Sequence, residues 1–333
     1  MKFIQHEKVM LIFFTSLIII FPEIFDSLVH SEDLPQPSNL SVEKVIPLTQ
    51  DSKYYIRPIL SPTGEKIAFS KRKFEGLWVM NIDGSETKQL SNRPGAGYKF
   101  SWSADGKEII YRVKKFIEGK EYGAIEKVDV FTGRIEQIFG FKRDVHPPHW
   151  SYTPAGVCIS FISQGERKNI PLNRKMSRKL LAHRSVKPHA TKILYFHNDN
   201  IWIMNEDGTQ KKQLTVDIGF DPVWAPNRNK IVYSKWDNLI VINPDGDQKV
   251  DLGRGINPSW APDSKKIVYQ ITEDDGHKIT GSNLYVINAD GSGRAQLTDT
   301  TDEFEFEPSW SPQGDKIVYR SDVNGQIYVL TVD

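Results

Sequence analysis

One short unit recurs along most of this sequence, and it limits the available folds more than any other feature. The unit is a Trp followed by a small residue and a turn, as in WAPD and WSPQ. It occurs at Trp102, Trp150, Trp224, Trp260 and Trp310. Leu60 fills the Trp position in a further copy, and residues 187–196 hold a copy without the Trp or the turn. Seven copies spaced by about 42 residues on average match the length of a four-stranded propeller blade.

Each copy contains the pattern of four short β-strands. The strand that ends in the Trp precedes a β-branched and aromatic strand such as KIVYS, and a third strand such as LYVIN follows. Asp-Gly pairs, including Asp290 and Gly291, supply the tight turn into the fourth strand. No helical periodicity of useful length occurs after the N-terminal segment. We therefore predict an all-β fold, a seven-bladed β-propeller of four-stranded antiparallel blades. The weak copy at 187–196 leaves six blades as the alternative.

The last copy lacks its fourth strand, because the chain ends at Asp333 where the turn should be. The segment KVIPLT, residues 44–49, resembles the fourth-strand endings of other copies and has no third strand of its own. We predict that it pairs with Gln326–Val332 and completes the last blade. The two ends of the chain would then close the ring.

The N-terminal segment differs from the repeats. An uncharged apolar run at 9–21 follows two lysines and is too short to span a bilayer comfortably. We interpret residues 1–31 as a signal peptide, with an uncleaved anchor as the alternative. Residues 32–44 are expected to form a polar linker and residues 45–333 the propeller. The single cysteine, Cys158, excludes an intramolecular disulfide.

The repeats resemble the WD40-like repeat of TolB-type β-propellers. DPVWAPNRNKIVYSKWDNLIVINPDG and NPSWAPDSKKIVYQ carry the resemblance most clearly, and it covers about residues 45–333. Propellers of this type serve as binding platforms and as domains of peptidases, so the resemblance implies a fold more than a function. TolB acts in the bacterial periplasm, where it binds the peptidoglycan-associated lipoprotein. This chain has no room for the N-terminal α/β domain of TolB and carries seven copies where TolB has six. The resemblance therefore implies export, to the periplasm or out of the cell, but not that partner.

A ring of polar residues is predicted at one mouth of the propeller. The residue three positions before the Trp slot opens each inner strand, and around the ring it is Arg57, Lys99, Pro147, Lys187, Asp221, Asn257 and Glu307. These residues are basic or neutral in blades one to four and acidic or neutral in blades five to seven. The loops at 70–76 and 112–123, against the loop at 271–281, repeat this asymmetry on the same face. Because rim loops often carry function, we expect ligand binding here.

We expect the ligand to be an extended protein segment, from a partner in the cell envelope. A carbohydrate is the other ligand considered. The net charge of +1 gives no field that favours nucleic acid. Contact with a membrane is expected only if the N-terminal apolar segment is not cleaved. We expect a monomer without a cofactor or a bound metal.

The sequence contains no recognised catalytic motif, such as G-x-S-x-G or H-E-x-x-H. One pair of residues still suggests an enzyme. His149 and His189 occupy the same position in consecutive copies, where they could bind a metal or act as a general base. We favour a polar rim with hydrogen bonds between blades as their role, because no metal-ligand spacing is kept. The alternative function is therefore a periplasmic carbohydrate-active enzyme, a lyase or hydrolase, and we favour the non-enzymatic binding protein.

Overall fold

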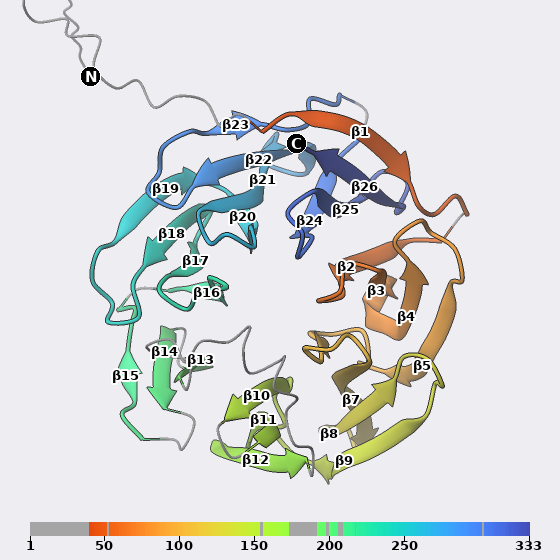
Figure 1. The fold of residues 1–333 in the computed structure, drawn as a ribbon. Helices are drawn as coiled ribbons and strands as arrows, with labels where there is room; N and C mark the ends of the chain where they lie inside the picture. The colour runs from red at the N-terminus through yellow and green to blue at the C-terminus, as the bar shows by residue number, and fades with distance from the viewer. Residues whose placement is uncertain are drawn as a thin grey trace, which may run out of the picture. The chain divides into compact units, whose positions relative to one another are not determined.

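Seven antiparallel sheets form a ring around a central axis (Figure 1). The structure is a computed structural model that describes residues 40–51, 53–153, 156–172, 192–197, 200–205, 209–216, 218–301 and 303–333. The predicted signal peptide, residues 1–31, lies outside these residues. The prediction of an all-β, seven-bladed propeller is confirmed, and the six-bladed alternative is wrong. Within the described residues, no helix has the length and apolar character needed to cross a membrane.

The first three blades follow the order of the chain. Blade one contains β2 (Tyr55–Leu60), β3 (Lys66–Lys71), β4 (Glu75–Asn81) and β5 (Lys88–Pro94), with a 3₁₀ turn at Arg72–Phe74. Blade two contains β6 (Ser101–Trp102), β7 (Glu108–Ile117), β8 (Lys120–Asp129) and β9 (Ile135–Lys142). Blade three contains β10 (His149–Thr153), β11 (Gly156–Ser163) and β12 (Glu166–Leu172).

The remaining blades repeat the arrangement. Blade four contains β13 (Lys192–His197), β14 (Asn200–Asn205) and β15 (Lys212–Gln213). Blade five contains β16 (Phe220–Trp224), β17 (Ile231–Lys235), β18 (Asn238–Ile242) and β19 (Val250–Arg254). Blade six contains β20 (Ile256–Trp260), β21 (Lys266–Asp274), β22 (Ile279–Asn288) and β23 (Ala295–Gln296). Blade seven contains β24 (Glu305–Trp310), β25 (Lys316–Ser321) and β26 (Ile327–Val332), followed by β1 (Val42–Pro47). The remaining strands that the repeat predicts for blades three and four fall within 173–191, outside the described residues.

The two ends of the chain meet in blade seven, as predicted. Strand β1 pairs antiparallel with β26, and Val45 lies opposite Leu330. The pairing extends beyond β1, because the backbone N–H of Leu48 donates to the carbonyl of Ile327 at 2.7 Å. Strand β1 begins at Val42, inside the segment expected to be a linker. Since β26 would otherwise expose an unpaired edge, the N-terminal strand closes the ring.

The repeated Trp residues join each blade to the one before it. Trp102, Trp150 and Trp260 are almost fully buried. Their indole N–H groups donate to the inner strand of the preceding blade, at Ile59, Ser101 and Val223, over 3.1–3.2 Å. The apolar cluster around Trp102 contains residues of both blade one and blade two. Burying an indole while pairing its N–H uses both parts of this side chain. The repeated Trp is therefore a packing residue between blades.

Candidate functional site

A β-bulge interrupts the inner strand in blades one, five, six and seven at the same place. In each, two residues of the inner strand lie opposite one residue of the second strand, and the second residue of the pair is Pro. The bulge pairs are Arg57–Pro58, Asp221–Pro222, Asn257–Pro258 and Glu307–Pro308. Because Pro has no backbone N–H, placing it in a bulge leaves no donor of the sheet unpaired.

The first residue of each bulge has a left-handed backbone. The φ angles are +55° at Arg57, +44° at Asp221, +53° at Asn257 and +56° at Glu307. Lys99, at the same position before β6, has φ +51°. A left-handed conformation costs about 1–2 kcal/mol for a residue with a Cβ. Bulges redirect side chains and are frequent beside functional sites, as is backbone strain of this kind.

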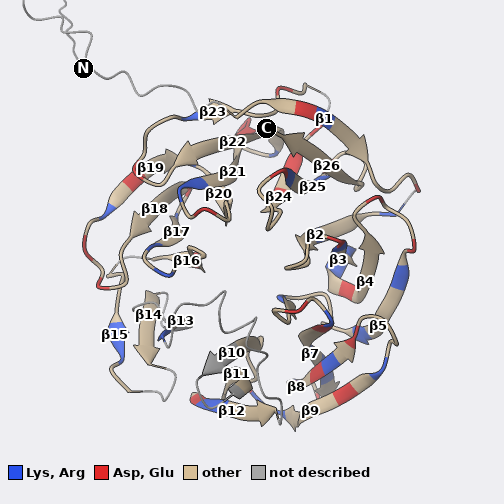
Figure 2. Cartoon of the chain, in the orientation of Figure 1, with Lys and Arg blue, Asp and Glu red and all other residues tan. Residues whose placement is uncertain are grey.

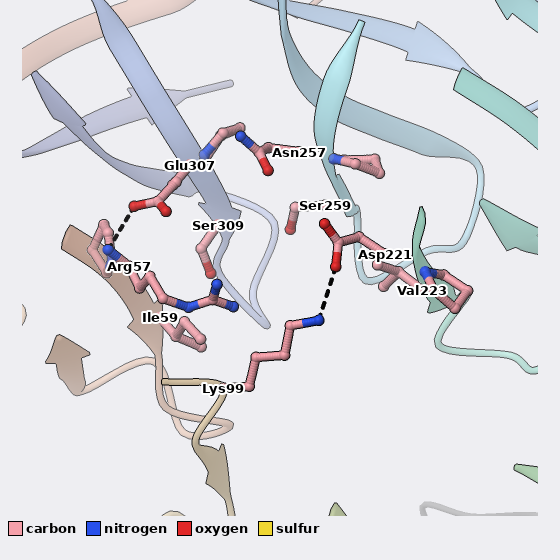
Figure 3. A pocket seen from close by; sticks show the side chains of 13 residues that line it. Arg57, Ile59, Lys99, Asp221, Val223, Asn257, Ser259, Glu307 and Ser309 are labelled. Carbon is pink, nitrogen blue, oxygen red and sulfur yellow. Dashed lines mark hydrogen bonds and ion pairs between the residues drawn. The ribbon is translucent and has the colours of Figure 1, made fainter. Parts of the chain in front are cut away.

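These residues surround a cavity of about 390 Å³ between the inner strands of these blades, which we call the mouth cavity (Figure 3). The start of the inner strand in blades one, five, six and seven supplies its walls, together with Lys99. Each bulge thus directs one polar side chain to the rim while the following residues form an apolar and hydroxyl-bearing wall. The cavity opens on the mouth face, defined here as the face of the blade-to-blade connections and of the hairpins between second and third strands.

Hydrogen bonds tie the bulges of blades six, seven and one together. The side-chain oxygen of buried Gln270 accepts from Asn257 Nδ2 at 3.0 Å and from the backbone N–H of Glu307 at 2.8 Å. Glu307 Oε2 accepts from the backbone N–H of Arg57 at 2.6 Å and from Arg320 Nε at 3.0 Å. This side of the cavity is therefore fixed before any ligand binds.

The basic side of the cavity is held differently. Lys99 Nζ reaches Asp221 Oδ1 at 3.0 Å and so links the connection before blade two to blade five (Figure 3). Both side chains are about half exposed, so solvent weakens this ion pair. The Arg57 guanidinium points into the cavity, and among the described residues it has no hydrogen-bond or ion-pair partner (Figure 3). Arg57 can therefore bind an anion without breaking an existing contact.

Five of the eight predicted site residues come together in this cavity: Arg57, Lys99, Asp221, Asn257 and Glu307. Lys187 and His189 lie outside the described residues. His149 lies in β10 directly before Trp150, two residues after the position equivalent to the bulge residues, and it does not line the cavity. That these residues bind a ligand stays a prediction.

His149 lies in an environment that favours its neutral form. Burial and the positive charges of Arg167 and Arg228 lower the pKa of His149 to about 4. Its Nε2 atom is buried without a hydrogen-bond partner. Within the described ranges, no group of three His, Cys, Asp or Glu side chains could hold a metal ion. Neighbouring cations also oppose the approach of a metal ion.

Two further residues, Gln270 and Arg320, support the side of the cavity formed by Asn257 and Glu307, and they were not among the predicted site residues. Each follows the aromatic residue of the second strand, in KIVYQ and KIVYR. The aromatic side chains, Tyr269 and Tyr319, are buried opposite the bulges. A polar residue directly after this aromatic was therefore a readable signal for a residue that contacts the rim.

The fold and the cavity define a closed β-propeller with a charged mouth. No protein-family model and no curated protein sequence matches the chain. Among solved structures it is similar to a putative TolB from Agrobacterium tumefaciens, with 15% identity, a TM-score of 0.50, and coverage of 88% of this chain and 97% of that one. It is also similar to TolB from Acinetobacter baumannii (17%, TM-score 0.44, coverage 84% and 64%) and to an oligogalacturonate lyase in complex with manganese (17%, TM-score 0.46, coverage 86% and 79%). Likeness at this identity concerns the fold alone, and it confirms the predicted TolB-like propeller.

Proposed function

We propose that this chain is an exported, non-enzymatic binding protein whose mouth face holds a segment of another protein of the cell envelope. The main support is the distribution of exposed apolar side chains. Of the ten large hydrophobic residues exposed within the described ranges, seven lie in or beside loops of the mouth face: Phe116, Ile117, Val216, Phe220, Trp236, Ile279 and Val323. Exposed apolar groups gathered beside polar residues are typical of protein-binding surfaces.

The mouth cavity gives this surface a polar centre. Arg57 offers an unpaired guanidinium, and the Lys99–Asp221 ion pair can exchange partners at low cost because it is solvated. A polypeptide segment can present both apolar side chains to the loops and charged groups to the cavity. A small ligand would use the cavity and leave the apolar loop tips exposed.

Site-specific photo-crosslinking in envelope extracts tests the proposal. A photoreactive phenylalanine analogue would replace Phe116 or Trp236 on the mouth face, and Phe131 serves as the matched control. Phe116, Trp236 and Phe131 are 63%, 65% and 59% exposed, and Phe131 lies in a turn on the opposite face. We expect a discrete protein adduct from the first two positions only, and its loss when Arg57 and Lys99 are both changed to Glu. Equal labelling at all three positions, or an adduct that survives the charge reversal unchanged, contradicts the proposal.

A second candidate function is a carbohydrate-active enzyme that uses His149. The free, neutral Nε2 of this residue is the observation that favours it, because a neutral imidazole can accept a proton. The positive charges beside His149 disfavour a metal-dependent version. Cleavage of a polysaccharide by the purified protein, lost in His149→Ala, would support this candidate over the binding protein.

A further inference from the structure

A second cavity, of about 620 Å³, opens on the mouth face between blades one and two. The hairpin loop between β3 and β4 forms one wall, the end of β5 forms another, and Lys114 of β7 completes it. Lys71, Lys73 and Lys114 line this cavity together with Phe74 and Trp78, and we call these five residues the basic groove. Neither the predicted function nor the mouth cavity accounts for it.

Positive charge in the basic groove is only partly compensated. Glu75 is the one acidic residue that lines the cavity within the described part of the chain. Lys71 and Lys73 form no ion pair with any described residue, and Lys114 makes a contact of 3.7 Å with Glu121, which also pairs with Arg112. Three lysines with so few neighbouring carboxylates attract anions from solution. Figure 2 marks the lysine and arginine residues of blades one and two on the ribbon.

The loop that carries these charges is held in a strained conformation. Lys73 and Phe74 are consecutive non-glycine residues with φ angles of +63° and +58°. Two contacts fix the loop: Phe74 packs edge-on against Tyr98 with 5.1 Å between ring centroids, and Lys71 Nζ lies 3.6 Å from the centre of the Trp78 ring. Strain of this kind persists only where surrounding contacts impose it, and it accompanies binding sites. The groove is therefore formed in advance.

The basic groove and the mouth cavity are neighbours. Tyr98, which packs against Phe74 of the groove, directly precedes Lys99 of the cavity. The contact between Phe74 and Tyr98 thus connects the basic residues of the mouth cavity, Arg57 and Lys99, to those of the basic groove. An extended chain that enters the cavity at Arg57 can cross the Phe74–Tyr98 pair and reach Lys73.

We infer that the basic groove binds carboxylate side chains of an acidic peptide segment that also enters the mouth cavity. This inference rests on the proposed function and names the chemistry of the ligand. Two observations favour a peptide over an anionic polysaccharide or a nucleic acid. Lys71 covers a face of the Trp78 ring, where a sugar or base would stack. Carboxylates also occur in the mouth-face loops of blades six and seven, at Glu273, Asp275 and Glu303, and they would repel a long polymer that is charged along its whole length.

Fluorescence anisotropy with defined peptides tests this inference. The probe is a labelled octapeptide of alternating Glu and Ser, and its comparison is the same peptide with Gln for Glu. We expect the Glu peptide to bind, and the triple variant Lys71→Gln, Lys73→Gln, Lys114→Gln to bind it about tenfold more weakly, since three exposed charge contacts together correspond to about that factor. The matched control, Lys107→Gln, Lys249→Gln, Lys265→Gln, removes the same charge from exposed turns of the opposite face and should bind normally.

The outcomes separate this inference from the proposed function. If Arg57→Glu, Lys99→Glu abolishes binding while the groove variant binds normally, the groove has no part in recognition and the binding mouth remains. An equal loss in the control variant reduces the effect to net charge and overturns the inference. Tighter binding of polygalacturonate or single-stranded DNA than of the Glu peptide also overturns it. If the triple variant unfolds, the double variant Lys73→Gln, Lys114→Gln, which keeps Lys71 on Trp78, gives the same test with a smaller loss.

Discussion

Blades six and seven share one geometry but differ in how the chain builds them. Each has the inner-strand bulge, a buried Tyr opposite the bulge, and a Trp at the end of the inner strand. Blade six comes from one continuous segment, whereas blade seven takes its outer strand from residues near the other end of the chain. The blade geometry therefore does not require a continuous chain. The positions of the two chain ends instead determine which blade closes the ring.

The two blades also differ at equivalent positions of the inner face. Blade six has Gly255, Asn257 and Gln270 where blade seven has Glu305, Glu307 and Arg320. The backbone arrangement is the same, yet blade six has a glycine and two neutral amides at these positions and blade seven has three ionisable side chains. A repeated scaffold thus leaves the chemistry of the mouth free to vary from blade to blade.

The largest effect is expected from removing the strand that distinguishes blade seven. The reference protein for this test lacks the predicted signal peptide and begins at residue 32. Deleting residues 32–50 from it removes β1 and exposes the edge of β26. We expect the free energy of unfolding to fall by about 5 kcal/mol, from lost apolar burial and hydrogen bonds, and Tm to fall by about 10 °C. Calorimetry measures both quantities.

The control for this deletion removes residues 32–39 and keeps β1, and its melting curve should match that of the longer chain. If the larger deletion also leaves the melting curve unchanged, then the pairing of β1 with β26 does not stabilise the ring.

The second largest effect is expected at the position that Gly255 occupies in blade six and Glu305 occupies in blade seven. A Cβ at Gly255 would lie 2.3 Å from a ring carbon of Tyr269, whose side chain is fully buried. Gly255→Ala should therefore destabilise the protein by about 3 kcal/mol through overpacking. Urea denaturation gives this value. The control is Gly140→Ala, where no atom lies within 4 Å of the added Cβ, and a cost for Gly255→Ala no larger than in this control would mean that the Tyr269 ring moves aside freely.

The blade count and the ring closure followed from the sequence because both depend on repeated local patterns. The Trp spacing indicated the number of blades, and the likeness of residues 44–49 to the fourth strands of other copies indicated the partner of β26. These features require only β-propensity, turn residues and counting. Pairing between strands then follows, because a propeller leaves few other partners for an unpaired edge.

The site was predictable in position but not in detail. Counting back from each Trp placed Arg57, Asp221, Asn257 and Glu307 at the mouth. Their left-handed backbone conformation could not be predicted from the sequence, since a residue before Pro is expected to be extended. The contacts of Gln270 and the packing of Lys71 on Trp78 also escaped prediction, because they join residues on different strands. The expectations for Lys187 and His189 stay predictions.

The third effect is a pH dependence specific to blade seven. Glu305 is almost fully buried, and burial raises its pKa from 4.5 to about 7. One carboxyl oxygen accepts from Thr300 Oγ1 at 2.6 Å, and the other has no partner. Between these two pKa values the folded protein keeps a proton that the unfolded chain has lost. The stability from this group is therefore complete at low pH and is lost as the pH rises through about 7.

Glu305→Gln tests this directly, because the amide stays neutral at every pH. Between about pH 5 and about pH 8, the free energy of unfolding of the variant should improve relative to wild type by about 2 kcal/mol. Urea denaturation at both pH values measures the difference. A gap between variant and wild type that is independent of pH would show that Glu305 titrates normally in the folded protein.

The smallest effect compares the two bulge residues, Glu307 and Asn257. Glu307→Ala leaves the Arg320 guanidinium, only 12% exposed, without one of its two carboxylate partners, and removes the acceptor of the Arg57 backbone N–H. We expect a loss of about 2 kcal/mol, below the usual cost of breaking a buried ion pair because Asp322 remains. Asn257→Ala removes one neutral hydrogen bond to Gln270, which still accepts from the Glu307 backbone, so about 1 kcal/mol is expected. Glu307→Gln, which keeps the shape and loses the charge, should fall between them. Equal losses in all three variants would mean that the charge of Glu307 adds nothing to the stability of this region. The backbone of the bulges, rather than the ion pair between Glu307 and Arg320, would then keep this side of the mouth cavity rigid.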